Sequence, residues 1–414
     1  MFGLFNRRRR FRNANQVKIT DSIGASGDQF GTSVAIAKYN KTIAIGARYD
    51  DNGATANTGS VNVFTYNGTW NNETKIHGTN AGDQLGVSVS LSENGNTLLI
   101  GVPYGDSGAT SNCGTALVYT RSGTTWSLEA TLSASDKAAN DEFGISVSLS
   151  NDGNTALIGA YYDAVGSNTN QGSAYVFTRS GTTWSEQQKL TDSGGAANDF
   201  FGFAVALSGD GDTALIGAYL DDTGGATTKE GSAVVFTRSG TTWSQQTKLT
   251  DSAGAGGDQF GVSVSLSNDG NTALVGSNSD TVGANTWQGS AVVFTRSGTT
   301  WSEQTKLTDS AGSGTDFFGH KVALSGDGNT ALIASYNNDI GANTNQGSAI
   351  VFTRNNTTWT EKIKLTDSAG VAGDKLGFGG VALSRDGNIV VIGVPEDDVG
   401  SNADQGSAVV FYRR

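Results

Sequence analysis

The segment Phe260-Gly-Val-Ser-Val-Ser-Leu-Ser-Asn-Asp-Gly-Asn-Thr272 begins with a Phe-Gly pair that recurs along the whole 414-residue chain. Leu replaces Phe in two of the copies. The seven pairs are separated by 55, 58, 58, 59, 58 and 58 residues, and they begin at Phe30, Leu85, Phe143, Phe201, Phe260, Phe318 and Leu376. A fixed period of this kind predicts one domain built from similar units that stack on their neighbours.

Each copy contains four candidate strands. In the third copy they are residues 145–150, 155–160, 173–179 and 186–191. The first three are almost continuously apolar, as expected for strands whose two faces are both buried. The fourth alternates between apolar and polar residues, as expected at a half-exposed edge. We therefore predict an all-β fold, a seven-bladed β-propeller with four-stranded blades.

The two ends of the chain predict how the ring closes. The last copy stops after its third strand, Ala408–Tyr412, whereas residues 16–22 match a fourth strand and its following loop at residues 247–252. We expect the N-terminal strand, near Val17–Thr20, to complete the last blade, because closure removes free sheet edges. The predicted domains are a basic arm at residues 1–15 and the propeller at residues 16–414.

The fourth strand carries a lysine at one position in most copies. We interpret it as a charge that protects an exposed edge strand from pairing with another sheet. These lysines are Lys75, Lys189, Lys248, Lys306 and Lys364. The fourth strand is accordingly the expected outer rim.

The charge is unevenly distributed along the chain. The net charge is −12, and without the five arginines of the arm the remaining body carries −17. A body this acidic repels nucleic acid, so any contact with phosphate would involve the arm. Most aspartates fall in loops that a propeller places on one face, whereas an arginine follows the third strand of most copies on the other face. We expect a disc that is acidic on one side.

Two interpretations of the aspartates stay open. Asp is common in turns because its side chain bonds the local backbone. Alternatively, carboxylates from adjoining loops bind Ca²⁺, which takes oxygen ligands. The possible metal ligands are Asp50, Asp51, Asp221, Asp222, Asp397 and Asp398, and the last four are also candidate ligand-binding residues. We expect no cofactor to be required.

Three motifs resemble a known family. They are Phe260–Thr272, Gly217–Asp222 and Gly289–Arg296, and together they are similar to the bacterial-type FG-GAP repeat, the unit of the integrin alpha-subunit propeller. The resemblance covers residues 16–412 and implies a non-enzymatic propeller for adhesion, ligand binding or scaffolding. The integrin-type calcium hairpin Asp-x-Asp-x-Asp-Gly is replaced here by turns such as Asn151–Asn154. We therefore do not transfer those calcium sites.

Tryptophan occurs in two settings. Six recur before the fourth strand, where they could pack between blades or bind sugar: Trp70, Trp126, Trp184, Trp243, Trp301 and Trp359. Trp287 instead lies in a loop where other copies have no aromatic residue. An isolated exposed tryptophan is a candidate contact anchor for a ligand.

Catalysis has little support in the sequence. His77 and His320 lie in different copies and share no motif, and Cys113 is the only cysteine. No nucleophile–base order or zinc-ligand spacing is present. We predict that the protein is not an enzyme.

The N-terminal arm combines apolar residues with arginines and lacks the order of a signal peptide. We predict that it binds a partner protein, an acidic surface or nucleic acid through Phe2, Leu4, Phe5, Arg7, Arg8, Arg9, Arg10 and Arg12. The expected function is a binding, adhesion or structural module in a virion, phage or cell-surface appendage, without a transmembrane segment. The alternatives are a lectin-like propeller that binds glycans and a scaffold subunit. The expected location is extracellular or on a particle surface, with the cytoplasm also open.

Overall fold

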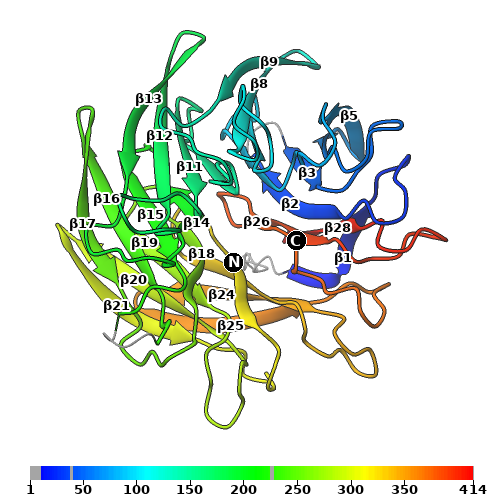
Figure 1. Ribbon diagram of the computed structural model, residues 1–414. Helices are drawn as coiled ribbons and strands as arrows, with labels where there is room; N and C mark the ends of the chain where they lie inside the picture. Colours follow the sequence, from blue (N-terminus) through cyan, green and yellow to red (C-terminus); the bar gives the residue numbers. More distant parts are fainter. Residues whose placement is uncertain (1–10, 38–40, 224–227, 414) are drawn as a thin grey trace, which may run out of the picture.

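The computed structural model describes residues 11–37, 41–223 and 228–413. Within them the chain forms seven four-stranded antiparallel sheets arranged as blades around a central axis (Figure 1). This arrangement confirms the predicted seven-bladed β-propeller.

The strand bounds follow the repeat. Blade one contains β2 (Phe30–Ile36), β3 (Thr42–Ala47), β4 (Ser60–Tyr66) and β5 (Trp70–His77). Blade two contains β6 (Ser88–Leu91), β7 (Thr97–Val102), β8 (Thr115–Ser122) and β9 (Thr125–Leu132). Blade three contains β10 (Ser146–Leu149), β11 (Thr155–Ala160), β12 (Ser173–Ser180) and β13 (Thr183–Leu190). Blade four contains β14 (Phe201–Leu207), β15 (Thr213–Ala218), β16 (Ser232–Ser239) and β17 (Thr242–Leu249).

The remaining blades continue in the same order. Blade five contains β18 (Phe260–Leu266), β19 (Thr272–Ser277), β20 (Ser290–Ser297) and β21 (Thr300–Leu307). Blade six contains β22 (Phe318–Leu324), β23 (Thr330–Ser335), β24 (Ser348–Asn355) and β25 (Thr358–Leu365). Blade seven contains β26 (Val381–Leu383), β27 (Ile389–Val394), β28 (Ser407–Arg413) and the N-terminal β1 (Phe11–Ile19).

Strand β1 closes the ring, as predicted. It pairs antiparallel with β28, so that Val17 lies opposite Val410 and Ile19 opposite Ala408. The strand begins at Phe11, whose side chain is 6 % exposed and belongs to a hydrophobic cluster. The sequence analysis assigned residues 11–15 to the arm. They belong to the blade instead, because β1 begins at Phe11, which pairs with Arg413 and is buried. Arg12 lies within β1 and is exposed, whereas the other predicted arm residues lie outside the described part of the chain.

The Phe-Gly pair joins neighbouring blades. Phe201 is fully buried in a cluster that also contains Leu157 and Val176 of the preceding blade. Gly202 has φ +94°, and a Cβ atom there would overlap the backbone oxygen of Ser173. Glycine is required where the backbone adopts this conformation and approaches its neighbour so closely. The pair therefore combines an apolar anchor with a direct contact between the backbones of two blades.

A chain of backbone hydrogen bonds links the hairpins between first and second strands. The amide of Glu93 donates to the carbonyl of Asn151 at 2.9 Å, and that of Asn151 donates to Gly209 at 2.9 Å. The series continues through Asn268 and Gly326 to Arg385. Since each hairpin belongs to a different blade, these hydrogen bonds connect neighbouring blades on the hairpin side of the ring.

Closure by β1 can be tested with two neighbouring apolar residues. Replacing buried Ile19 by Ala should lower the free energy of unfolding by about 2–4 kcal/mol, because it leaves a cavity between the first and last blades. Replacing Val17 by Ala should change the free energy of unfolding by less than about 0.5 kcal/mol, because Val17 lies on the same strand but is 42 % exposed. Urea denaturation measures both values, and equal effects would contradict the role of β1 in closure.

Candidate binding face

One face of the ring carries two kinds of loops that bond to each other. We call it the loop face. One kind of loop connects the fourth strand of a blade to the first strand of the next blade, such as residues 191–200. The other kind connects the second and third strands of one blade, such as residues 161–172. The amide of Gly257 donates to the carbonyl of Thr228 at 2.8 Å across two such loops. On the opposite side, Arg179 Nε donates to Asn154 Oδ1 of a hairpin at 2.9 Å. The aspartate-rich loops and the repeated arginines thus lie on opposite faces.

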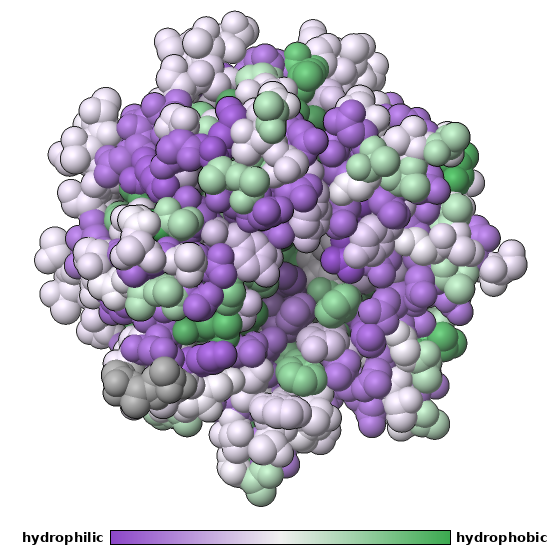
Figure 2. Space-filling model, viewed as in Figure 1, coloured by the Kyte–Doolittle hydropathy of each residue, from purple (hydrophilic) through white to green (hydrophobic). Residues whose placement is uncertain are grey.

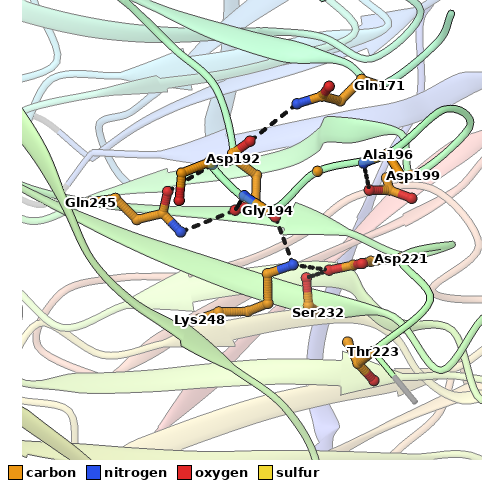
Figure 3. A network of polar contacts seen from close by, with 12 residues as sticks. Gln171, Asp192, Gly194, Ala196, Asp199, Asp221, Thr223, Ser232, Gln245 and Lys248 are labelled. Carbon is orange, nitrogen blue, oxygen red and sulfur yellow. Dashed lines mark hydrogen bonds and ion pairs between the residues drawn. The ribbon is translucent and has the colours of Figure 1, made fainter. Parts of the chain in front are cut away.

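The carboxylates of the loop face are held by lysines of the fourth strands. Lys248 Nζ lies 2.7 Å from Asp192 Oδ2 and 2.5 Å from Asp221 Oδ2 (Figure 3). Ser232 Oγ also donates to Asp221 Oδ2 at 2.6 Å. Burial alone would lower the pKa of Lys248, but its hydrogen bonds to Asp192 and Asp221 raise that pKa above its usual value. The lysine therefore stays charged between two aspartates that are each 4 % exposed.

This Asp–Lys–Asp bridge recurs around the ring. One fourth-strand lysine joins an aspartate in the loop between the second and third strands of its own blade to an aspartate in the loop that arrives from the preceding blade. The other bridges are Lys75 with Asp21 and Asp50, Lys189 with Asp136 and Asp163, Lys306 with Asp251 and Asp280, and Lys18 with Asp367 and Asp397. In blade six, Lys364 binds Asp309 at 2.7 Å and Asn338 Oδ1 at 3.2 Å. The lysines thus fix loops, a role beyond the edge protection predicted from the sequence.

Blade two lacks the bridge, and it lacks all three of its members. Thr131 pairs with Leu117 at the position that Lys189 takes opposite Tyr175 in blade three. Gly78 and Gly105 stand where the two aspartates stand in other blades. The simultaneous loss of one cation and two anions leaves no buried charge unpaired, which is the condition that buried ionic groups must meet.

The predicted metal and ligand aspartates have separate structural tasks. Asp50, Asp221 and Asp397 belong to the bridges, where a lysine ammonium already lies beside each carboxylate. Their sequence neighbours accept backbone amides within their own loops: Asn57 donates to Asp51 at 2.7 Å, Lys229 to Asp222 at 2.7 Å and Asp404 to Asp398 at 3.0 Å. In the described ranges, no group of three or more His, Cys, Asp or Glu side chains is arranged to hold a metal ion. Calcium binding at these residues stays a prediction.

A further set of aspartates precedes the Phe-Gly pairs. Asp199 is 2 % exposed, and its Oδ2 accepts the amide of Ala196 at 2.5 Å. Burial raises the pKa of Asp199 to about 6, although the hydrogen bond from Ala196 opposes the shift. The same cause raises the pKa of Asp28, Asp141 and Asp374 to about 6. Because most loop aspartates are buried or bonded, the face presents less acid to solvent than its composition suggests.

The six repeated tryptophans pack between blades. Trp184 Nε1 donates to Glu129 Oε1 of the preceding blade at 2.9 Å, and the Arg179 guanidinium lies 5.4 Å from the Trp184 ring centroid. The indole of each other member likewise donates to a neighbouring blade: Trp70 to Tyr412, Trp126 to Glu73, Trp243 to Gln187, Trp301 to Gln246 and Trp359 to Gln304. These contacts favour the packing interpretation over sugar binding by these residues.

Trp287 heads a row of aromatic side chains on the loop face. It is 52 % exposed, and its ring stacks on Phe317 with centroids 6.2 Å apart. Phe317 stacks on Tyr336 at 5.3 Å, and Tyr336 contacts Phe378 at 5.1 Å and His320 at 4.7 Å. We call Trp287, Phe317, Tyr336, His320 and Phe378 the aromatic row. The sequence pointed to Trp287 alone, although Phe317 replaces a residue that is Gln in three other copies.

A second aromatic cluster lies between blades three and four. Phe200 stacks on Tyr219 at 5.7 Å, and Phe203 contacts Tyr219 at 4.6 Å. Tyr161 and Tyr162 complete the cluster, with their ring centroids 4.1 Å apart. The sequence analysis missed this group because its members come from three segments that only the ring brings together.

The residues considered for catalysis are dispersed. The His320 ring lies between Asn278 Nδ2 at 3.4 Å and the Phe378 carbonyl at 3.2 Å, and burial lowers its pKa to about 3. Cys113 is buried, and burial raises the pKa of its thiol. His77 lies in blade one beside Asp50, at 4.0 Å. These side chains do not form a common site.

The Asp–Lys–Asp bridge makes a testable contribution to stability. Lys248→Met should lower the free energy of unfolding by about 2–4 kcal/mol, because it leaves two buried carboxylates without a cation. Asp221→Asn should cost less than about 1 kcal/mol, since Asn338 occupies the equivalent position in blade six and still accepts from Lys364. Urea denaturation gives both values, and a larger loss in the Asn variant would refute this account.

The buried aspartates also predict a pH dependence. Their pKa is near 6 in the folded protein and 3.8 ordinarily, so the folded state binds more protons between these values. The contribution of these aspartates to stability should be greatest below this window and should decrease as the pH rises from 3.8 to 6. We expect a lower melting temperature at pH 7.5 than at pH 5, and a smaller difference in Asp199→Asn. A melting temperature that rises over this interval would exclude protonation of these aspartates as the cause.

Comparison with known proteins agrees with this geometry. A family model described as FG-GAP repeat matches residues 14–64, 126–177, 184–236, 243–294, 301–352 and 359–411. No curated protein matches the chain. In the described part of the chain, no helix has the length and apolar character needed to cross a membrane. The FG-GAP propeller fold is compatible with a binding or structural role, and the matches cover most of the blades. The chain therefore belongs to the FG-GAP repeat family.

Proposed function

We propose that the protein is a non-enzymatic binding module whose contact surface is the aromatic row on the loop face. The observation that carries this proposal is Trp287, a large apolar side chain that is 52 % exposed and directed by its loop into solvent. Exposed aromatic residues with neighbouring apolar contacts are common anchors of protein interfaces.

The backbone conformation at Trp287 supports the proposal that tryptophan is present at this position for binding and not for folding. Trp287 has φ +56°, in the left-handed region that large side chains rarely adopt. The equivalent loop position in other blades is held by Asn57, Asn112, Asn170 and Asn345, with Lys229 and Asp404 in the remaining two. Asparagine tolerates this conformation well. A tryptophan here therefore costs stability and exposes apolar surface without filling the core.

The surroundings of Trp287 suit an interface. Phe317 and Tyr336 extend the aromatic surface from Trp287 by successive stacking contacts. Exposed Asp339 and Asp398 lie in neighbouring loops of the same face and would supply a polar rim. An aromatic centre with a polar border fits a partner protein that presents apolar or aromatic side chains.

The wider setting of this module is an assembly. We place it on a virion, a phage or a cell-surface appendage, extracellular or on the particle surface, with the arginine-rich arm as its tether. Support comes from the contrast between the basic arm and the acidic body, since opposite charges on one chain allow separate partners. A purely structural subunit would use the same faces to contact sister proteins.

Glycan binding is the second candidate. It rests on the exposed Trp287 ring alone, because the repeated tryptophans direct their indole N–H groups to neighbouring blades. Aromatic rings can accommodate the apolar face of a sugar as well as a protein side chain.

Trp287→Asn separates binding from stability. The variant should keep or slightly raise the melting temperature, because asparagine suits the left-handed backbone, while weakening partner affinity by about 30-fold or more. Affinity is measured against partners captured from the native surface fraction and against a glycan array. Ile23→Asn, at a loop residue that is 73 % exposed, is the matched control and should bind normally. Unchanged partner affinity of Trp287→Asn would disprove the proposed contact surface.

A further inference from the structure

The axis of the propeller contains a chamber that every blade lines. Its volume is about 230 Å³, and it lies toward the loop face, where the surface is hollowed near the centre of the ring (Figure 2). A second chamber of about 240 Å³ continues toward the hairpins. One valine from each blade lines the first chamber, and all of them except Val147 also line the second: Val34, Val89, Val147, Val205, Val264, Val322 and Val381. The wall thus combines a ring of valines with serine and threonine side chains.

Lys321 is the exception in this wall. Among the described residues that line the loop-side chamber, it is the only charged one. The equivalent residue in four other blades is a serine: Ser33 Oγ donates to the Gly86 carbonyl at 2.7 Å, and Ser88 Oγ to Gly144 at 2.8 Å. A lysine at this position cannot repeat that short contact, so its longer side chain occupies the channel.

The described chain does not neutralise Lys321. Gly380 of blade seven lines the same chamber, but it faces the backbone of Val34 in blade one. Within the described chain, no carboxylate lies within ion-pair distance of Lys321. Burial lowers its pKa, and the nearby positive charge of Arg48 lowers it further. A buried cation without a counter-charge is energetically costly unless an anion joins it.

A second donor faces the chamber beside Lys321. Ser263, on the neighbouring strand β18, accepts the amide of Val322 at 3.0 Å. Unlike Ser33 and Ser88, its hydroxyl makes no donated hydrogen bond to the described chain, so its proton is available to a ligand. The chamber therefore offers an ammonium group and a hydroxyl donor above a ring of valines.

We propose that the loop-side chamber binds a small monocarboxylate. Lys321 Nζ supplies the charge-assisted hydrogen bond, Ser263 Oγ donates the second bond, and the valines contact the apolar part of the ligand. One cation and one hydroxyl match the single charge and two oxygens of a carboxylate. A phosphate dianion would bring more charge and more acceptors than these two donors satisfy. The site does not depend on the function proposed for the aromatic row.

The test uses the full chain labelled with ¹⁵N at its lysine side chains and titrated with sodium butyrate at constant ionic strength. One Nζ resonance should shift saturably, and calorimetry should give the same dissociation constant. Lys321→Ser installs the residue that four other blades carry, so it should fold normally, lose that resonance and bind butyrate at least tenfold more weakly. Lys362→Ser, on the exposed rim strand β25, should leave binding unchanged.

The choice of ligand tests the chemistry of the site. Butyrate should bind more tightly than formate, because its chain reaches the valines, and inorganic phosphate should bind more weakly than butyrate. Ser263→Ala should weaken butyrate binding severalfold while leaving the Lys321 resonance in place. Butyrate binding that survives in Lys321→Ser would overturn the proposal. Equal affinity for phosphate and butyrate, or the absence of a saturable shift, would overturn it as well.

Discussion

The structure depends on a backbone contact between neighbouring blades that leaves no room for side chains. The glycine of each Phe-Gly pair faces the second strand of the preceding blade, and in six of the seven contacts the facing residue is also glycine. Gly159 shows the constraint, because a Cβ atom there would overlap the carbonyl oxygen of Gly202. At the remaining contact, Gly377 faces Ala334. This spacing draws the inner strands together, so the residues that follow each Phe-Gly pair must line the axis.

A ring fixed in this way separates two kinds of polar residue. The repeated charges are used internally: Lys248 joins Asp192 and Asp221, and Trp184 bonds Glu129 of the preceding blade. Blade two lacks the Asp–Lys–Asp bridge altogether, with Thr131 in place of the lysine, whereas blade six keeps the bridge with Asn338 in place of one aspartate. Function is therefore to be sought where one blade departs from the others and the departure has no internal partner.

The fold could be predicted well from the sequence, because each copy of the repeat corresponds to one blade. The Phe-Gly spacing gives the number of blades, and the match between residues 16–22 and other fourth strands gives the closure, which β1 confirms. The bridges could not be predicted, since Asp192, Asp221 and Lys248 come from three segments and their contact requires the closed sheet. The aromatic row was found only at Trp287, because the neighbours that complete it belong to different blades. Aligning the copies would have marked Lys321, but only the ring places it in the channel.

The two strongest departures from the repeat both carry a cost and both lie toward the loop face. Trp287 holds a bulky side chain in a left-handed conformation that asparagine adopts easily, and Lys321 brings an uncompensated charge into a valine-lined channel. Four other blades have an asparagine in place of Trp287, and four have a serine in place of Lys321. Proteins commonly break their own local rules at functional sites and offset the cost elsewhere. Here the repeated contacts between blades stabilise the ring and compensate for this cost. They are distributed around the whole ring and do not involve either residue.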